Sequence, residues 1–216
     1  MAKNDVRLAI ASPTTGLMRV EYVESLLAMQ KDLLYKSNWR VKDIKLLYYC
    51  SSVIPKNRQE IVKQAKEWGA THIFWIDDDM QFPTIAAKRL LDRMLKEPDK
   101  YLILGANCIK RKYPIEYMAV SLDDKEVVSN DKEGIEEVFY TGNAFVLMNM
   151  DVFFEVQEPW FAFAWNNAKQ DFGTEDIYFM AKAKQVGIKT YIDHEVSQLI
   201  NHIGYWTFQP QHRQPS

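Results

Sequence analysis

The chain has 216 residues, 47% of them hydrophobic, and a formal net charge of −2. This composition supports one well-packed domain, and the charge lacks the basic surplus that a dedicated duplex-DNA binder shows. No run approaches the roughly 20 apolar residues of a membrane-spanning helix. Residues 1–5 contain no apolar signal core. Cys50 and Cys108 have no metal-type spacing, which favours a reducing, cytoplasmic setting.

Strands and helices are predicted to alternate through the first half of the sequence. Short apolar runs indicate strands at residues 6–11, 44–50, 72–76 and 101–104. Apolar residues at helical spacing indicate helices at residues 20–34, 56–68 and 83–97. This β-α-β-α-β-α-β order is typical of a parallel sheet with right-handed crossovers.

The pattern changes after Gly105. Short strands separated by polar turns are expected at residues 115–122, 126–129, 136–140 and 144–148. A helix is expected at 174–186, and closing strands at 188–192 and 196–200. The fold class predicted is therefore α/β, with a mostly parallel central sheet, helices on both faces and a mixed or antiparallel second half.

Three carboxylates, Asp77, Asp78 and Asp79, close the buried third strand. In open α/β sheets, ligands bind at the edge where the parallel strands end. Like charges this close repel, so the cluster needs a cation or solvent to offset them, and magnesium and manganese prefer such oxygen ligands. A solvated acidic turn before the next helix is the alternative interpretation.

Four segments in chain order carry a resemblance to a known family: Ala11-Ser12-Pro13-Thr14, Phe74-Trp75-Ile76-Asp77-Asp78-Asp79, Tyr140-Thr141-Gly142-Asn143-Ala144-Phe145 and Gly173-Thr174-Glu175-Asp176-Ile177-Tyr178-Phe179. Together they resemble GT-A type glycosyltransferases with an Asp-x-Asp motif, in the compact form of bacteria and phages. The resemblance runs from Val6 to about Phe208. It implies a Rossmann-type sandwich forming a single domain over residues 1–216, with a nucleotide-binding lobe of about 1–109 and an acceptor and catalytic lobe of about 110–216.

The same resemblance implies a metal-dependent reaction. A sugar would move from a nucleoside-diphosphate sugar, most often a uridine one, to an acceptor hydroxyl, with manganese or magnesium as cofactor. Asp79 would bind the metal together with His202, and Asp77 would face the nucleotide and share the metal. The metal would offset charge on the leaving diphosphate. Asp78 is expected to face the ribose or to make a structural hydrogen bond.

Glu175 and Asp176 open a predicted helix, where acidic side chains also favour the helix dipole. The resemblance favours Asp176 as the general base, a role worth roughly 10²–10⁴ in rate. Glu175 would grip the acceptor. A Glu-Asp pair at this place favours an inverting reaction.

Further contacts to the nucleotide sugar are implied for residues that follow strands or open helices. These are Pro13, Thr14, Thr15, Arg58, Lys110, Arg111, Gly142 and Asn143, together with Asp77 and Asp78. A plain turn between a strand and the next element explains the presence of several of these residues equally well. The family's usual Arg-Asn pair is Arg58-Gln59 here. Aromatic residues could form an acceptor wall or lid, with Trp160, Trp165 and Trp206 as candidates.

The acceptor is left open by the sequence. A glycan or another cell or phage surface molecule is the first expectation. The alternative is a hydroxymethylated pyrimidine base in DNA, which the Lys110–Lys112 run favours and the net charge disfavours. A non-catalytic module that binds nucleotide or glycan ranks below both, because it would not need Glu175 and Asp176.

Overall fold

The computed structural model describes residues 5–35, 41–167 and 170–204. The first half of the chain contains β1 (Val6–Thr14), α1 (Val20–Tyr35), β2 (Val41–Cys50), α2 (Ile54–Trp68), β3 (His72–Ile76), β4 (Met80–Gln81), α3 (Thr84–Lys96) and β5 (Ile103–Gly105). The second half contains β6 (Ile135–Val138), β7 (Phe145–Asn149), α4 (Val152–Glu155), β8 (Ala164–Asn166), β9 (Asp171–Gly173), α5 (Glu175–Gln185), β10 (Thr190–Asp193), α6 (His194–Ser197) and β11 (Asn201–His202).

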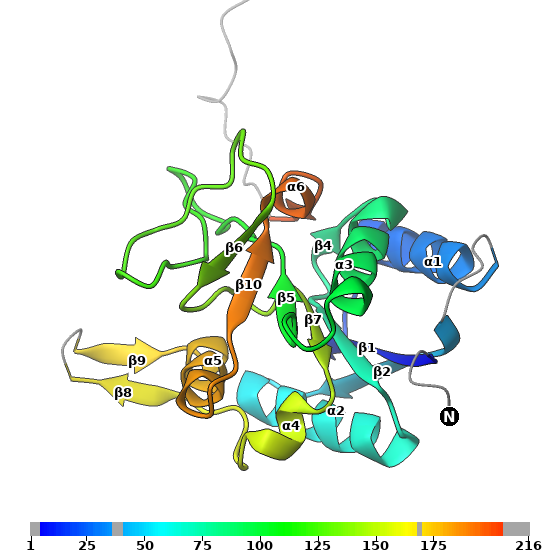
Figure 1. The fold of residues 1–216 in the computed structure, drawn as a ribbon, viewed down its shortest axis with the longest axis horizontal. Coiled ribbons are helices and arrows are strands. Elements are labelled where there is room, and N and C mark those ends of the chain that lie inside the picture. The colour runs from blue at the N-terminus through cyan, green and yellow to red at the C-terminus, as the bar shows by residue number, and fades with distance from the viewer. Residues whose placement is uncertain (1–4, 36–40, 168–169, 205–216) are drawn as a thin grey trace, which may run out of the picture.

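A seven-stranded sheet in the order β2-β1-β3-β7-β5-β10-β6 forms the centre of the fold (Figure 1). Strands β2, β1, β3, β5 and β10 point the same way, while β7 and β6 run against their neighbours. The predicted fold class, a mostly parallel sheet with a mixed second half, is confirmed.

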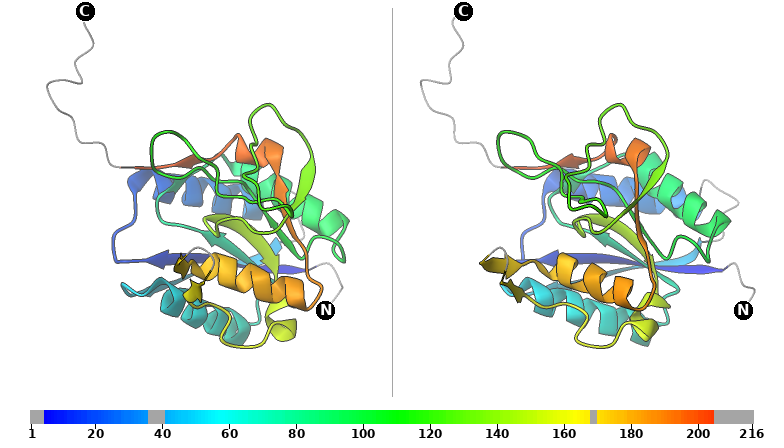
Figure 2. Two further views of the ribbon diagram at one scale, coloured as in Figure 1. Left: turned by 90° about the vertical axis from the view of Figure 1, so that its left-hand side faces the viewer. Right: turned by 60° about the vertical axis from the view of Figure 1, so that its left-hand side comes forward.

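Helices cover both faces of the sheet. The residues of β1 and β3 are therefore buried on both sides. On one face Ile10 and Phe74 pack in a cluster with residues of α1 and α3. On the other, Ala11 and Trp75 pack in a cluster with residues of α2, α4 and α5. Figure 2 shows the two helical layers on opposite sides of the sheet. None of the described helices is long and apolar enough to cross a membrane.

The four strands predicted in the first half are parallel to one another, but β3 and β5 are not neighbours in the sheet. Strand β7 lies between β3 and β5 and is antiparallel to both, with Phe74 paired to Leu147 and Leu104 to Leu147. Mixed or antiparallel strands were expected after Gly105, but an apolar run does not specify its neighbours, so the sequence pattern could not reveal that this strand lies between β3 and β5.

Two other predicted sets of strands are wrong. Residues 115–122 and 126–129 form turns with isolated bridges, such as Val120 to Glu126, and no extended strand. Residues 196–200 do not form a strand either, because α6 begins at His194. The side chain of Asp193 caps that helix by accepting hydrogen bonds from the backbone N–H groups of Glu195 and Val196.

Phe145 of β7 provides a test of this central position. Its fully buried ring lies 4.8 Å from that of Phe74 and 4.9 Å from that of Phe82. Phe145→Ala should lower the free energy of unfolding by about 3–5 kcal/mol, because it leaves a cavity between the sheet and α3. The control, Phe163→Ala, removes a 50% exposed ring and should change stability by no more than about 0.5 kcal/mol. Equal urea midpoints for both variants would contradict this packing.

Candidate functional site

The acidic triplet lies just past the end of β3, and its backbone is held by three distant segments. The N–H of Asp77 donates to Ala144 O at 3.1 Å. Asp78 O accepts from Arg19 N at 3.1 Å, and Asp79 O accepts from Ile203 N at 2.8 Å. These bonds tie the triplet to β7, to the start of α1 and to the end of the described chain. The three carboxylates therefore stand on a turn after β3 whose backbone is fixed by these bonds.

Arg58 of α2 joins the triplet to the start of α5. Its Nη2 lies 3.1 Å from Asp77 Oδ1, and its Nε lies 2.9 Å from Glu175 Oε1. The guanidinium is buried, with its centre 5.1 Å from the ring of Trp75. Burial raises the pKa of Asp77 to about 6, although Arg58 opposes that rise. Glu175 therefore contacts Arg58, and its side chain is 9% exposed.

Asp79 is the meeting point of two other basic groups. Its Oδ1 lies 3.3 Å from His202 Nε2, and its Oδ2 lies 2.6 Å from Arg111 Nη1. Strand β11 pairs with β4, opposing His202 to Met80, which brings the imidazole beside the triplet. Burial opposes the charge on Asp79, yet His202 and Arg111 hold its pKa below the usual value. Burial likewise disfavours imidazolium, but Asp79 and Ile109 O raise the pKa of His202.

The donor set beside β3 fits a divalent metal held by two protein ligands. Nδ1 of His202 donates to Ile109 O at 2.8 Å, which leaves Nε2, on the Asp79 side, as the ring nitrogen for a metal. Magnesium commonly uses one or two protein ligands and completes its shell with phosphate oxygens and water. Among the described residues, no group of three His, Cys, Asp or Glu side chains is arranged to hold a metal. Asp77, expected as a further ligand, is bound to Arg58.

A cavity of about 170 Å³ opens on the triplet side. Residues from two of the predicted segments line it: Pro13, Thr14 and Thr15, and Asp77, Asp78 and Asp79. Burial raises the pKa of Asp78, and a hydrogen bond with the Thr14 side chain opposes this. The cavity is also lined by Ser51, Ser52, Ile54 and Asn57, which the sequence analysis missed. They lie at and after the end of β2, so the rule that ligands bind at strand ends could have found them.

A second cavity, of about 300 Å³, opens on the Asp176 side. Asp176 Oδ1 accepts hydrogen bonds from the Thr174 hydroxyl and, at 2.8 Å, from Ile177 N. Its Oδ2 lies toward Gly142, where an added Cβ would be 3.6 Å away. Burial and the neighbouring Glu175 raise the pKa of Asp176. The carboxylate is therefore anchored through one oxygen, and its raised pKa makes it a stronger base than an ordinary aspartate.

Buried polar atoms without hydrogen-bond partners gather at this site. Six such side-chain atoms are found among the described residues, and four of them belong to Asn57, Arg58 and Asn143. Both the oxygen and the nitrogen of the Asn143 amide are among them, although the residue is 1% exposed. Native proteins rarely leave such groups unpaired, so these atoms are available to bond with a ligand or ordered water.

The basic run Lys110–Lys112 is divided between carboxylates. Lys110 and Lys112 lie 2.9 and 2.5 Å from Glu116, and Arg111 lies 2.6 Å from Asp79. Lys110 lines the cavity on the Asp176 side, away from the triplet. Lys110 and Lys112 share the carboxylate of Glu116 and Arg111 pairs with Asp79, so two carboxylates offset most of the charge of the run.

The three tryptophans considered as an acceptor wall differ in their surroundings. Trp160 is 2% exposed, and its Nε1 donates to Val156 O at 2.9 Å. Its ring packs against Phe153, so it faces the core and not a surface that an acceptor could reach. Trp165 is 50% exposed in β8, on the hairpin that leads through β9 into α5 (Figure 1). Trp206 lies outside the described residues.

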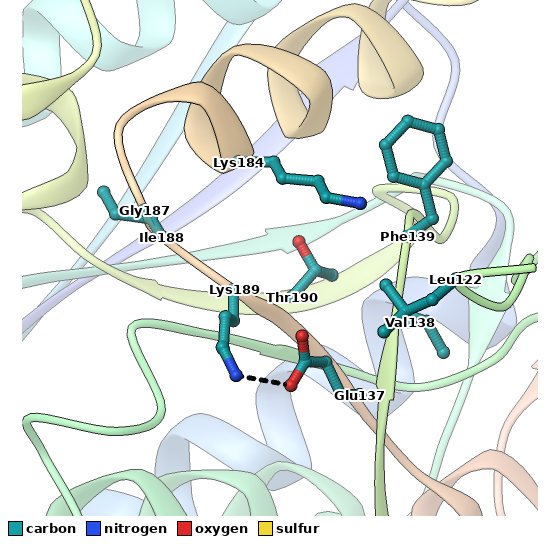
Figure 3. A pocket seen from close by; sticks show the side chains of 9 residues that line it. All are labelled: Leu122, Glu137, Val138, Phe139, Lys184, Gly187, Ile188, Lys189 and Thr190. Atoms are coloured by element: carbon teal, nitrogen blue, oxygen red, sulfur yellow. Dashed lines mark hydrogen bonds and ion pairs between the residues drawn. The ribbon is translucent and has the colours of Figure 1, made fainter.

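Two further features lie away from the triplet. The pocket in Figure 3 lies between β6, β10 and the end of α5. There Lys189 is paired with Glu137 at 2.8 Å, and Lys184 lies over the ring of Phe139. Elsewhere His194 contacts both Ser129 and Glu136 at 2.9 Å, as in a hydrolase triad. Ser129 is 0% exposed, so its hydroxyl cannot meet a substrate.

Comparisons with known proteins agree on the fold. No known family profile matches the chain, and no curated protein sequence matches it significantly. The crystal structure of A197 from STIV matches with a TM-score of 0.58 and 16% identity, over 86% of this chain and 81% of that one. GalNAc-T7, crystallised with UDP, GalNAc and Mn²⁺, matches with a TM-score of 0.56 and 12% identity.

The GalNAc-T7 alignment covers 89% of this chain and 43% of the larger protein. At such low identities these likenesses show the fold alone. Together with the sheet and its helical layers, they define a GT-A-like, Rossmann-type α/β protein.

The Arg58 bridge yields a stability prediction. Arg58→Met leaves the buried carboxylates of Asp77 and Glu175 without their counter-charge, so the free energy of unfolding should fall by about 3–5 kcal/mol. Arg89→Met is the control: its ion pair with Glu195 has side chains 34% and 32% exposed, and its loss should cost less than about 1 kcal/mol.

Adding Asp77→Asn and Glu175→Gln to Arg58→Met should restore most of the lost stability, because no unpaired buried charge remains. Urea unfolding followed by circular dichroism measures all four proteins. An Arg58→Met protein as stable as Arg89→Met would show that the bridge is not needed.

Proposed function

We propose that the protein is a metal-dependent glycosyltransferase that moves a sugar from a nucleoside-diphosphate sugar, specifically a UDP-sugar, to an acceptor hydroxyl. One observation carries the proposal: the two ends of the Arg58 bridge each lie beside a cavity. Asp77 lines the first and Asp176 the second. A transfer between two substrates needs both held beside a single reaction centre, and this arrangement provides a place for each.

The cavity beside the triplet suits the nucleotide. The loop of Pro13, Thr14 and Thr15 would surround the base, and the Asp78 carboxylate, next to the Thr14 hydroxyl, would face the ribose. Asn57 Oδ1, buried without a partner, would gain one from the bound nucleotide. The presence of UDP in the GalNAc-T7 crystal structure supports the choice of uridine.

The diphosphate would lie against the basic and metal-binding side of the triplet. Asp79 and His202 would hold manganese or magnesium, which when bound supplies Lewis-acid stabilisation of the leaving diphosphate. Arg111, already beside Asp79, presents a planar guanidinium suited to phosphate oxygens. Gly142 and Asn143, whose neighbour Ala144 binds Asp77, would border the donor sugar.

Asp176 is proposed as the general base. It would take the proton of the acceptor hydroxyl as the hydroxyl oxygen bonds to the anomeric carbon of the donor sugar. The bond from that carbon to the phosphate oxygen breaks, and the nucleoside diphosphate leaves with the bonding electron pair. Direct attack opposite the leaving group inverts the anomeric carbon. Glu175 acts as a positioning residue, because its contact with Arg58 fixes the start of the helix that carries Asp176.

Metal binding gives the first test of the proposal. Asp79→Asn should weaken binding of Mn²⁺ in the presence of UDP at least about tenfold, because an amide oxygen replaces a charged ligand. Glu137→Gln is the matched control, since that carboxylate pairs with Lys189 at a distant pocket and should leave the affinity unchanged. Isothermal titration calorimetry measures both. An unchanged affinity in Asp79→Asn would remove Asp79 from the metal site.

Loss of the base gives the second test. Asp176→Asn should lower the transfer rate by about 10²–10⁴ while leaving the Kd for UDP unchanged. In the unmodified protein, transfer should fall on the acid side at a higher pH than an ordinary aspartate would give, because the pKa of Asp176 is raised and only its deprotonated form accepts the proton. Asp151→Asn, an exposed substitution before α4, is the control.

Product NMR would report whether the anomeric configuration inverts. Full turnover by Asp176→Asn would overturn the assignment of the base. Binding of UDP-sugars without hydrolysis or transfer would instead favour a non-catalytic module.

A further inference from the structure

The cavity on the Asp176 side has a wall that the sequence analysis did not identify. Besides Asp176 and Gly142, it is lined by side chains of the segment 110–126, including Glu116, Tyr117 and Glu126. This segment makes turns over the sheet and closes on the core through backbone bonds such as Met118 N to Cys108 O, at 2.9 Å. The cavity therefore lies between an irregular loop and the start of α5.

The charge of this wall is negative. Glu116, Glu126 and Asp176 contribute carboxylates. Among the described residues that line the cavity, Lys110 is the one with a basic side chain. The Lys110 ammonium lies 2.9 Å from Glu116, and Lys112 contacts the same carboxylate at 2.5 Å, so the charge of Glu116 is offset. The uncompensated negative charge of the lining therefore comes from Glu126 and Asp176. A ligand carrying phosphates or carboxylates would meet uncompensated like charge here, which costs several kcal/mol at close range.

The remaining surface of the cavity is aromatic and apolar. Tyr117 and Tyr140 line it together with Met118, Val120 and Ile177. The Tyr117 hydroxyl donates to Asn130, and the Tyr117 backbone N–H donates to Glu126 Oε1 at 2.5 Å. These bonds fix one ring and one carboxylate in place. Ring faces beside a few fixed oxygen acceptors match a ligand that carries both C–H and O–H groups.

We propose that this cavity is the acceptor site and that it takes an uncharged saccharide. The inference rests on the proposed function and specifies its acceptor. Glu126 accepts hydrogen bonds from the acceptor's hydroxyls, Tyr117 packs on its ring, and one further hydroxyl reaches Asp176. The same lining excludes a hydroxymethylated base in DNA, because the flanking phosphates would approach the carboxylates of Glu126 and Asp176.

The experiment compares two acceptors of equal size that differ in one charge. Aryl glucosides and aryl glucuronides are offered with a hydrolysable UDP-sugar and Mn²⁺, beside a duplex containing hydroxymethylcytosine. The unmodified protein should use the glucoside at least about tenfold better than the glucuronide, which corresponds to about 1.4 kcal/mol, and should not modify the duplex.

Glu126→Lys should narrow the ratio of kcat/KM for glucoside over glucuronide at least about tenfold, because it places a cation where a carboxylate stood. Tyr117→Ala should raise the acceptor KM with little change in kcat. Glu133→Gln, an exposed substitution outside the cavity, should leave the glucoside-to-glucuronide ratio of kcat/KM and the acceptor KM unchanged. A merely structural role for Glu126 would lower both rates together without changing their ratio.

The outcomes distinguish failure of the proposed function from failure of the acceptor inference alone. Absence of any metal-dependent binding or hydrolysis of UDP-sugars would overturn the proposed function and this inference with it. Three results would overturn this inference alone, provided that the protein hydrolyses the donor. These are transfer to the duplex, a preference for the glucuronide over the glucoside, and no transfer to any saccharide. A glucoside preference that survives unchanged in Glu126→Lys would overturn the role assigned to Glu126.

Discussion

The contact on which the candidate site depends is the one between Arg58 and two carboxylates from opposite ends of the sequence. Asp77 follows β3, Glu175 opens α5, and the buried guanidinium of Arg58 holds both within 3.1 Å. Its planar fork makes two directed bonds, which a lysine could not reproduce. A buried charge this deep is tolerable only while it is paired. Arg58 therefore links the first residue of the triplet to the first residue of α5, the helix that carries Asp176.

Asp79 and Asp176 lie in two different electrostatic environments. On one side Asp79 is surrounded by His202 and Arg111, which stabilise its ionised form. On the other, Asp176 has Glu175 as its neighbour, and burial together with that charge raises its pKa. The pKa of one aspartate is thus lowered and that of the other is raised. Such divergence between neighbouring carboxylates is typical of sites that divide acid, base and metal roles.

The sequence was informative wherever local pattern decides structure. The buried run His72–Ile76 and the helix of residues 174–186 were predicted close to their observed bounds, and the carboxylates at their ends follow from them. Mixed or antiparallel strands were expected in the second half, but the position of β7 between β3 and β5 was not predictable, because an apolar run does not specify its neighbours. The helix α6 was missed because a single cap residue, Asp193, outweighed an apolar pattern. The sequence could not reveal that Arg58 bridges Asp77 and Glu175, or that Tyr117 lines the cavity beside Asp176. Both features depend on contacts between residues far apart in sequence.

The position of β7 has a consequence for how the protein is made. Strand β3 pairs with β7 from His72 opposite Asn149 to Ile76 opposite Phe145, and β5 reaches that part of the sheet only through β7. During synthesis the growing chain must therefore present the apolar edge of β3 until Asn149 has left the ribosome. Such non-local pairing is slow, and an unpaired apolar edge is prone to aggregation. The binding site matures later still, because β11 brings His202 to Asp79 among the last described residues of the chain.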